Sequence, residues 1–180
     1  QAAYPDRFFE VGVAEQNMMG IAAGLALSGK IPFITSYATF SPGRNWDQIR
    51  VSICYSEANV KIVGAHAGIS VGPDGATHQA LEDLAITRVL PNLTVVVPTD
   101  SVEAKKATFA AAFNGKPTYL RFAREKTPVM TTEETPFEIG KAEIFWQGKN
   151  PQVAIIGCGH LVYEALLAAR QLHEKGIESL

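Results

Sequence analysis

Cysteine is scarce in this sequence of 180 residues: only Cys54 and Cys158 occur, each within an apolar stretch. Two core thiols that stay reduced are typical of cytoplasmic proteins, so we expect no disulfide bond. No apolar run reaches the ~18 residues that a transmembrane helix needs, and no signal-peptide pattern opens the chain. Like charges form no run and the net charge is −2, which predicts neither a nucleic-acid nor a membrane surface.

The remaining composition is that of a compact globular protein, with 47% hydrophobic and 19% charged residues. The sequence begins without Met and stops after a helical segment, at residues 176–180, where another strand is expected. We therefore expect the chain to be truncated at both ends.

Short apolar segments alternate with helical ones along most of the chain. Apolar segments without polar alternation predict buried strands at residues 30–35, 60–65, 93–97 and 118–122. The segments around them predict helices at residues 14–28, 44–57, 78–88 and 101–113. This order predicts a doubly wound α/β domain with a parallel sheet, whose ligands lie beyond the carboxyl ends of the strands.

The same pattern divides the chain into three parts. Residues 1–126 form the α/β domain, and residues 127–150 are polar and bear Pro and Gly, which predicts a linker. Residues 151–180 contain one expected strand at 152–156 and one helix at 160–175. One βα unit is too small to bury its own core, so it predicts the incomplete start of a second α/β domain.

Glu15 is a carboxylate at the start of an otherwise apolar helix. One interpretation is a first-turn acid that the helix macrodipole or an ion pair stabilises. The other is a carboxyl group kept away from water, which can donate a proton near neutral pH.

The segment from His66 to Gln79 is rich in glycine and carries two histidines and Asp74. Its glycines allow the backbone to approach a ligand closely, so we favour a loop that binds a polar ligand over an ordinary structural loop. A metal site is the least favoured interpretation, because His66 and His78 do not match a zinc spacing.

Arg124 follows a strand and is suited to bidentate binding of phosphate, with a surface ion pair to Glu125 or a neighbour as the alternative. Phe40 is either a core residue or a stacking platform, and Arg44 is either solvated or part of an interface. A further segment, Gly157–Gly159, lacks the third glycine of the dinucleotide fingerprint and reads as a tight turn.

Four motifs together resemble transketolase, most densely over residues 6–126. They are Gly12–Gln16 around the glutamate, Gly72–Gln79 with its Asp-Gly-Ala-Thr-His-Gln sequence, Pro91-Asn92 before the next strand, and Phe40–Trp46 with its Phe-Ser-Pro-Gly-Arg-Asn-Trp sequence. The last motif is similar to the C-terminal subunit of split transketolases.

The resemblance implies the pyrimidine-binding domain of a thiamine-diphosphate enzyme. Glu15 would then hydrogen-bond N1′ of the aminopyrimidine and favour the imino tautomer, whose 4′ nitrogen removes the thiazolium C2 proton. Phe40 would stack on the pyrimidine, although the aromatic residues of this region are spaced differently from those of the family.

The resemblance also implies sugar contacts. Asp74 and His78 would contact hydroxyls at the ketose end of the substrate, and His78, near the first carbon's hydroxyl, would be catalytic together with Glu15. His66 and Arg124 would hold the sugar phosphate.

The Gly-Asp-Gly motif with its following Asn, through which the family binds the cofactor's diphosphate by way of magnesium, does not occur in this sequence. We therefore expect no metal on this chain, and a diphosphate-binding domain or N-terminal subunit as partner in a homo- or hetero-oligomer. The implied reaction is transfer of a two-carbon ketol unit between sugar phosphates.

Four alternatives remain at this point. Deoxyxylulose phosphate synthase shares the glutamate and Thr-His-Gln motifs but usually carries Arg where His66 stands. The pyruvate dehydrogenase beta subunit lacks that loop. A non-catalytic interaction module is a third alternative, and a nucleotide-binding protein centred on residues 157–159 is the weakest.

Overall fold

The computed structural model describes residues 2–180. Its helices are η1 (Pro5–Arg7), α1 (Glu15–Leu27), α2 (Trp46–Gln48), the π-helix η2 (Ile49–Tyr55), η3 (Ile69–Asp74), η4 (Ala76–His78), α3 (Asp83–Arg88), α4 (Ser101–Phe113) and α5 (Leu161–Glu174). Its strands are β1 (Phe33–Tyr37), β2 (Lys61–Ala65), β3 (Thr94–Val96) and β4 (Thr118–Arg121).

The four strands form one parallel sheet in the order β1-β2-β4-β3. The register places Ile34, Ile62 and Tyr119 in one row across the sheet. Thr35, Val63 and Leu120 form the next row, on the opposite face, because successive side chains of a strand alternate. The predicted parallel α/β fold is thereby confirmed.

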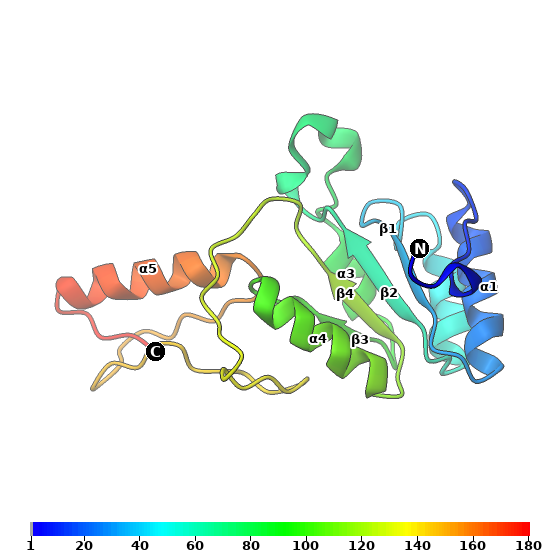
Figure 1. Ribbon diagram of the computed structural model, residues 1–180. Coiled ribbons are helices and arrows are strands. Elements are labelled where there is room, and N and C mark those ends of the chain that lie inside the picture. The colour runs from blue at the N-terminus through cyan, green and yellow to red at the C-terminus, as the bar shows by residue number, and fades with distance from the viewer. Residues whose placement is uncertain (1) are drawn as a thin grey trace.

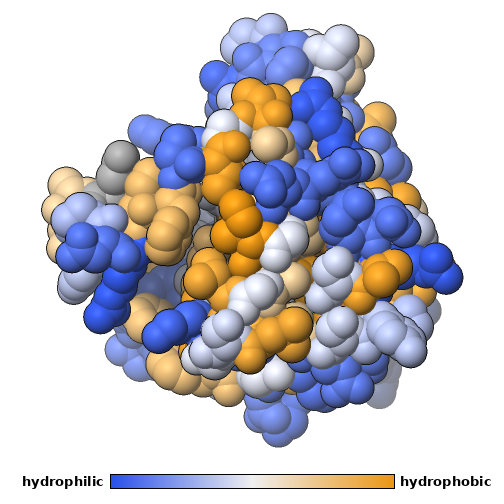
Figure 2. Space-filling model, turned by 90° about the vertical axis from the view of Figure 1, so that its right-hand side faces the viewer, coloured by the Kyte–Doolittle hydropathy of each residue, from blue (hydrophilic) through white to orange (hydrophobic). Residues whose placement is uncertain are grey.

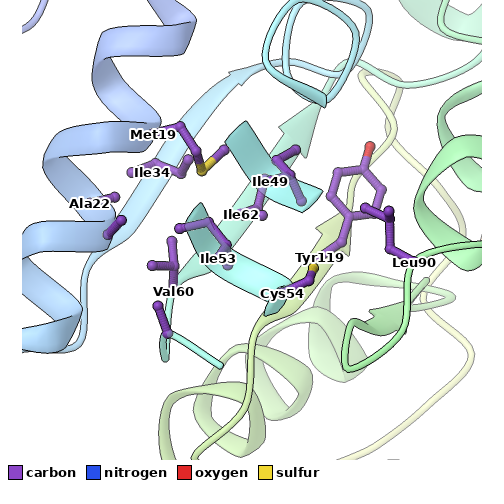
Figure 3. Close-up of a cluster of buried hydrophobic side chains, with 12 residues drawn as sticks. Met19, Ala22, Ile34, Ile49, Ile53, Cys54, Val60, Ile62, Leu90 and Tyr119 are labelled. Carbon is purple, nitrogen blue, oxygen red and sulfur yellow. The ribbon is translucent and has the colours of Figure 1, made fainter. Parts of the chain in front are cut away.

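Helices cover the sheet on both faces (Figure 1). On one face α1, η2 and α3 pack over the row of Ile34, Ile62 and Tyr119, with Met19 of α1 completely buried between them (Figure 3). On the other face α4 packs over Leu120 and β3. Strands buried on both faces explain why their sequences show no polar alternation.

Two helices differ from those expected. The helix predicted at 44–57 begins at Trp46 and continues as the π-helix η2. The helix predicted at 78–88 begins only at Asp83, since the backbone is extended at Gln79 after the turn η4. In both cases the first residues of the predicted helix belong to the preceding loop, although their local propensity favours a helix.

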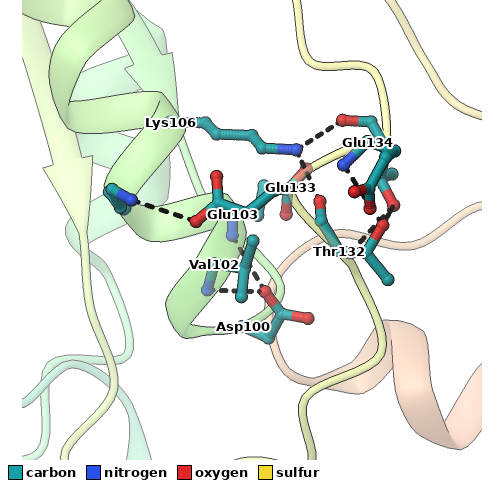
Figure 4. A network of polar contacts seen from close by, with 9 residues as sticks. Asp100, Val102, Glu103, Lys106, Thr132, Glu133 and Glu134 are labelled. Atoms are coloured by element: carbon teal, nitrogen blue, oxygen red, sulfur yellow. Dashed lines mark hydrogen bonds and ion pairs between the residues drawn. The ribbon is translucent and has the colours of Figure 1, made fainter.

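The segment predicted as a linker contains no helix or strand within residues 127–150, yet it is bound to the start of α4 (Figure 4). Asp100 caps α4 by accepting from the N–H groups of Val102 and Glu103, and its other oxygen accepts from those of Met130 and Thr131. Burial raises the pKa of Asp100, but these hydrogen bonds outweigh it and hold the pKa below its ordinary value. The segment is therefore fixed to the first domain.

The strand predicted at 152–156 does not form. Val153 makes a single parallel bridge to Ser179, and two backbone bonds follow it at Ile155 and Leu180. A strand needs a continuous neighbouring ladder, and residues 178–180 form only this one bridge with the segment. The predicted helix is present as α5.

The two thiols differ in their surroundings. Cys54 is buried, and burial raises its pKa to about 11. Cys158 is exposed, so the expectation of two core thiols was wrong for this residue. Its turn leaves the side chain uncovered. Among the described helices none is long and apolar enough to cross a membrane.

Candidate functional site

The predicted site residues gather at one edge of the sheet. Tyr37 ends β1, His66 follows β2, and Arg124 lies three positions after β4. The loop that carries Asp74 and His78 rises above the same edge (Figure 1). Ligands of parallel α/β sheets bind at this edge, which agrees with the expectation from sequence.

Glu15 is the first residue of α1, and only 8% of its surface is exposed. Arg44 Nη1 donates to both carboxylate oxygens, at 3.2 Å to Oε1 and 3.4 Å to Oε2. Glu15 thus combines one structural feature of each interpretation, and its role as a proton donor stays a prediction. It is a helix-start acid in an ion pair, and it is also largely removed from water.

The turn between β1 and α2 places Arg44 opposite Glu15. Gly43 is required there, because a Cβ at this position would lie 2.1 Å from the carbonyl oxygen of Thr39. The buried Asn45 side chain then donates to the backbone carbonyl of Glu15 at 3.2 Å and to Ser41 Oγ at 3.1 Å. The start of α1 and this turn are thus held together through polar side chains.

An aromatic cluster lies next to the ion pair. The Tyr37 ring is 4.4 Å from that of His66 and 5.7 Å from that of His78, measured between centroids. The Phe40 ring lies 5.1 Å from that of His78 and 4.1 Å from the Arg44 guanidinium carbon. Phe40 therefore contacts both His78 and the guanidinium group of Arg44 that pairs with Glu15.

His66 has two features of a functional residue. Its φ of 56° is left-handed, a conformation that a residue with a Cβ adopts only when its surroundings enforce it. Its Nδ1 is buried and has no hydrogen-bond partner among the described residues. By contrast His78 Nδ1 lies 2.9 Å from Thr77 Oγ1, so one nitrogen of its ring already has a partner.

Arg124 pairs with Asp74. Its Nη1 lies 3.3 Å from Asp74 Oδ2 and also donates to the carbonyl of Val71. The ion pair expected as the alternative is therefore present, with Asp74 as the partner instead of the adjacent Glu125. Arg124 thus connects β4 to the loop that carries Asp74 and His78.

A second arginine, Arg121, holds the C-terminal end of that loop through an ion pair with Asp83. Arg121 Nε and the Tyr119 hydroxyl both donate to Asp83 Oδ2 at 2.8 Å, and Asp83 is 1% exposed. The Tyr119 hydroxyl fits only because residue 64 is Gly, where a Cβ would lie 2.1 Å from the hydroxyl oxygen. Above this group the loop closes on itself through an antiparallel bridge between Gly68 and Ala80.

Two negative observations delimit the site. Within residues 2–180 no group of three or more His, Cys, Asp or Glu side chains could hold a metal ion. A cavity of about 450 Å³ lies elsewhere, between β3, residues 137–146 and α5, and none of the predicted site residues lines it.

The sequence matches the family "Transketolase, pyrimidine binding domain" over residues 1–130. The chain belongs to this family. The resemblance inferred from its motifs is thereby confirmed, including its likeness to the C-terminal section of split transketolases.

The curated relatives are longer than this chain. A transketolase C-terminal section of Methanocaldococcus jannaschii is 47% identical over 98% of this chain, which spans 56% of that protein. A 6-deoxy-6-sulfo-D-fructose transketolase subunit of Clostridium sp. is 41% identical over 96% of this chain and 53% of its own length. A solved structure of a split-gene transketolase, an inactive beta4 tetramer, has a TM-score of 0.89 and 43% identity, and the match covers 99% of this chain and 57% of that one. The chain thus spans about half the length of these relatives.

The roles of three residues in this site escaped the sequence analysis: Tyr37, Arg44 and Asp83. Tyr37 lies after the strand predicted at 30–35, and Asp83 reads as a helical acid. Arg44 stands 29 positions from Glu15, so no local spacing indicates their pairing. The glycine at position 43, just before Arg44, was the available signal of a close turn.

Proposed function

We propose that this chain is the pyrimidine-binding part of a transketolase that transfers a two-carbon ketol unit between sugar phosphates with thiamine diphosphate. The observation that carries the proposal is the buried carboxylate of Glu15, which is linked through the Arg44 guanidinium to the ring of Phe40. Residues 1–126 are the domain concerned, residues 127–150 are a linker, and residues 151–180 begin a second domain.

The residues present fit the pyrimidine half of the cofactor. Glu15 offers a carboxylate that is only 8% exposed, and the half-buried Phe40 offers a ring on which a flat heterocycle stacks. When bound, the cofactor supplies the nucleophilic carbon of the reaction. Glu15 holds or donates the proton at the pyrimidine N1′, and the residues around it exclude water.

The same edge offers polar groups for a sugar. Asp74 and His78 bind the hydroxyls of the ketose, and His78 also acts at the reacting end. His66 and Arg124 bind the phosphate, and the unpartnered Nδ1 of His66 is a buried polar atom that a ligand would satisfy.

A partner completes the site by binding the diphosphate and magnesium. The outer surface of α1 is suited to such a partner, because Ile21 and Leu27 are exposed there beside Gly20 and Gly24. Figure 2 looks onto the side on which α1 lies and shows a band of hydrophobic residues between hydrophilic regions. A related beta4 tetramer described as inactive is in keeping with this requirement.

The test is reconstitution. The chain is assayed with xylulose 5-phosphate and ribose 5-phosphate, alone and with a diphosphate-binding partner subunit. We expect activity only in the mixture. Activity of the lone chain would contradict the requirement for a partner, and an inactive, correctly assembled mixture would contradict the proposed reaction.

A second candidate substrate is suggested by one relative. A sulfonate carries a single negative charge at the position of a phosphate, and the relative from Clostridium is named for a 6-deoxy-6-sulfo sugar. Comparing 6-deoxy-6-sulfo-fructose with fructose 6-phosphate as donors decides between the two anions.

A further inference from the structure

We propose that Arg44 is an internal occupant of the pyrimidine subsite, which closes the subsite until the cofactor displaces its side chain. This inference rests on the proposed function, because it takes Glu15 and Phe40 as the pyrimidine contacts. It adds a residue that competes with the cofactor for both of these groups.

The geometry places one flat cation on both contacts at once. The guanidinium carbon of Arg44 lies 4.1 Å from the centroid of the Phe40 ring. Its Nη1 lies 3.2 Å from Glu15 Oε1. A ligand that stacks on this face of Phe40 and donates to Glu15 must therefore use the space that the guanidinium fills.

A guanidinium resembles an aminopyrimidine in the properties that matter at this site. Both groups are planar and delocalised, both stack on aromatic rings, and both present N–H donors to a carboxylate. Arg44 thereby satisfies a carboxylate that is only 9% exposed in its side chain and would otherwise lie unpaired.

The contact is also weak enough to be replaced. The Arg44 side chain is 50% exposed, and its two distances to the Glu15 oxygens, 3.2 and 3.4 Å from a single nitrogen, are longer than those of a bidentate pair. Solvent therefore screens the ion pair, and water can hydrate the guanidinium group when that group leaves Glu15.

Only the side chain needs to move. The backbone of Arg44 is fixed by its own N–H, which donates to the Phe40 carbonyl at 2.8 Å, and by its carbonyl, which accepts from Gln16 Nε2 at 3.2 Å. The turn thus keeps its shape while the guanidinium swings out. Arg44 lowers the affinity for the cofactor by the free energy needed to break its two contacts.

The experiment measures binding of thiamine diphosphate, with magnesium, by titration calorimetry on the complex with the diphosphate-binding partner. Arg44→Met keeps the length of the side chain and removes its planar cation, so we expect the dissociation constant to fall about three- to tenfold. Arg44→Lys keeps the positive charge but not the planar guanidinium group, so its dissociation constant should lie between those of the wild type and Arg44→Met. Arg170→Met is the matched control, because it breaks an exposed Arg–Glu pair on α5, and it should leave binding unchanged.

Ionic strength gives a second readout. Salt screens the wild-type ion pair. Raising the salt concentration from about 0.02 to about 0.5 M should therefore bring the dissociation constant of the wild type closer to that of Arg44→Met. An unchanged or weaker affinity of Arg44→Met, with an unaltered thermal unfolding midpoint, would overturn the inference and make Arg44 a support for Glu15 or a direct contact. If the wild-type complex binds no thiamine diphosphate, the proposed function itself fails.

Discussion

Two arginine–carboxylate pairs on this chain differ in the exposure of the arginine. The pair of Glu15 and Arg44 is half exposed on its arginine side, with 3.2 Å between nitrogen and oxygen. In the second pair the side chains of Asp83 and Arg121 are 1% and 14% exposed, and Asp83 Oδ2 lies 2.8 Å from Arg121 Nε. The same two chemical groups therefore form one contact that is partly open to solvent and another that is almost closed to it.

The difference lies in what surrounds the carboxylate. Asp83 Oδ2 accepts from Tyr119 as well as from Arg121, so removing any member leaves buried groups unpaired. The Glu15 carboxylate has one partner side chain on the solvent side, which a ligand with similar donors can replace. Breaking each pair separately tests whether one is a ligand site and the other an anchor.

The largest effect is expected on catalysis at Glu15. In the reconstituted complex Glu15→Gln should lower turnover about 10²- to 10⁴-fold, the usual contribution of general acid–base catalysis. Its free energy of unfolding should change by no more than about 1 kcal/mol, because the ion pair with Arg44 is half exposed. Steady-state kinetics and urea unfolding measure the two quantities. Near-normal turnover would reduce Glu15 to a helix-start acid.

At the buried pair the expected effect is on stability. Asp83→Ala should lower the free energy of unfolding of the full chain by about 3–5 kcal/mol, because the charge of Arg121 and the hydroxyl of Tyr119 lose their partner. Asp83→Asn keeps an acceptor and should lose less. Glu174→Ala, which breaks an exposed pair with Arg170, is the control and should cost no more than about 0.5 kcal/mol. Equal losses for Asp83→Ala and Glu174→Ala would contradict the role of Asp83 as an anchor.

A third arginine, Arg124, is intermediate in exposure at 34%, and it pairs with Asp74. Arg124→Ala removes a charge-assisted hydrogen bond to the sugar phosphate, which corresponds to about one to two decades in the specificity constant for phosphorylated ketoses. The short donor hydroxypyruvate, which carries no phosphate, should be affected much less. Equal losses for both donors would show that Arg124 supports the loop through Asp74 rather than binding the phosphate.

The last comparison concerns Lys61, a buried cation without a carboxylate partner among the described residues. Its Nζ donates to Asn59 Oδ1, Asn114 Oδ1 and the carbonyl of Lys116. Burial lowers the pKa of Lys61 to about 8 from 10.5. Between these values the unfolded chain holds a proton that the folded chain has lost, so the free energy of unfolding rises with pH.

Lys61→Met should abolish this contribution, which is a slope of at most about 1.4 kcal/mol per pH unit for one proton. Urea unfolding of both proteins from about pH 7 to about pH 10 measures it as the difference between the two curves. Parallel curves over this range would show that Lys61 keeps its proton in the folded state.

The sequence predicted the sheet better than it predicted the connections. The four apolar segments became β1, β2, β3 and β4, and none of their ends shifted by more than three residues, since uninterrupted apolar residues are required where both faces are covered. The segment at 152–156 has the same pattern and forms no strand. Its neighbour provides only one bridge, at Ser179, and a strand is defined by pairing as well as by composition.

The sequence by itself determined the fold class, the family and which side chains could bind a ligand or catalyse a reaction. It could do so because apolar periodicity, glycine positions and motif spacing are local properties. Which arginine pairs with which acid was decided only by the tertiary structure. Arg44, Arg121 and Arg124 find carboxylates 29, 38 and 50 positions away along the chain. Parallel strands bring such distant segments to one edge, and the burial found there makes one pair a replaceable contact and another a fixed anchor.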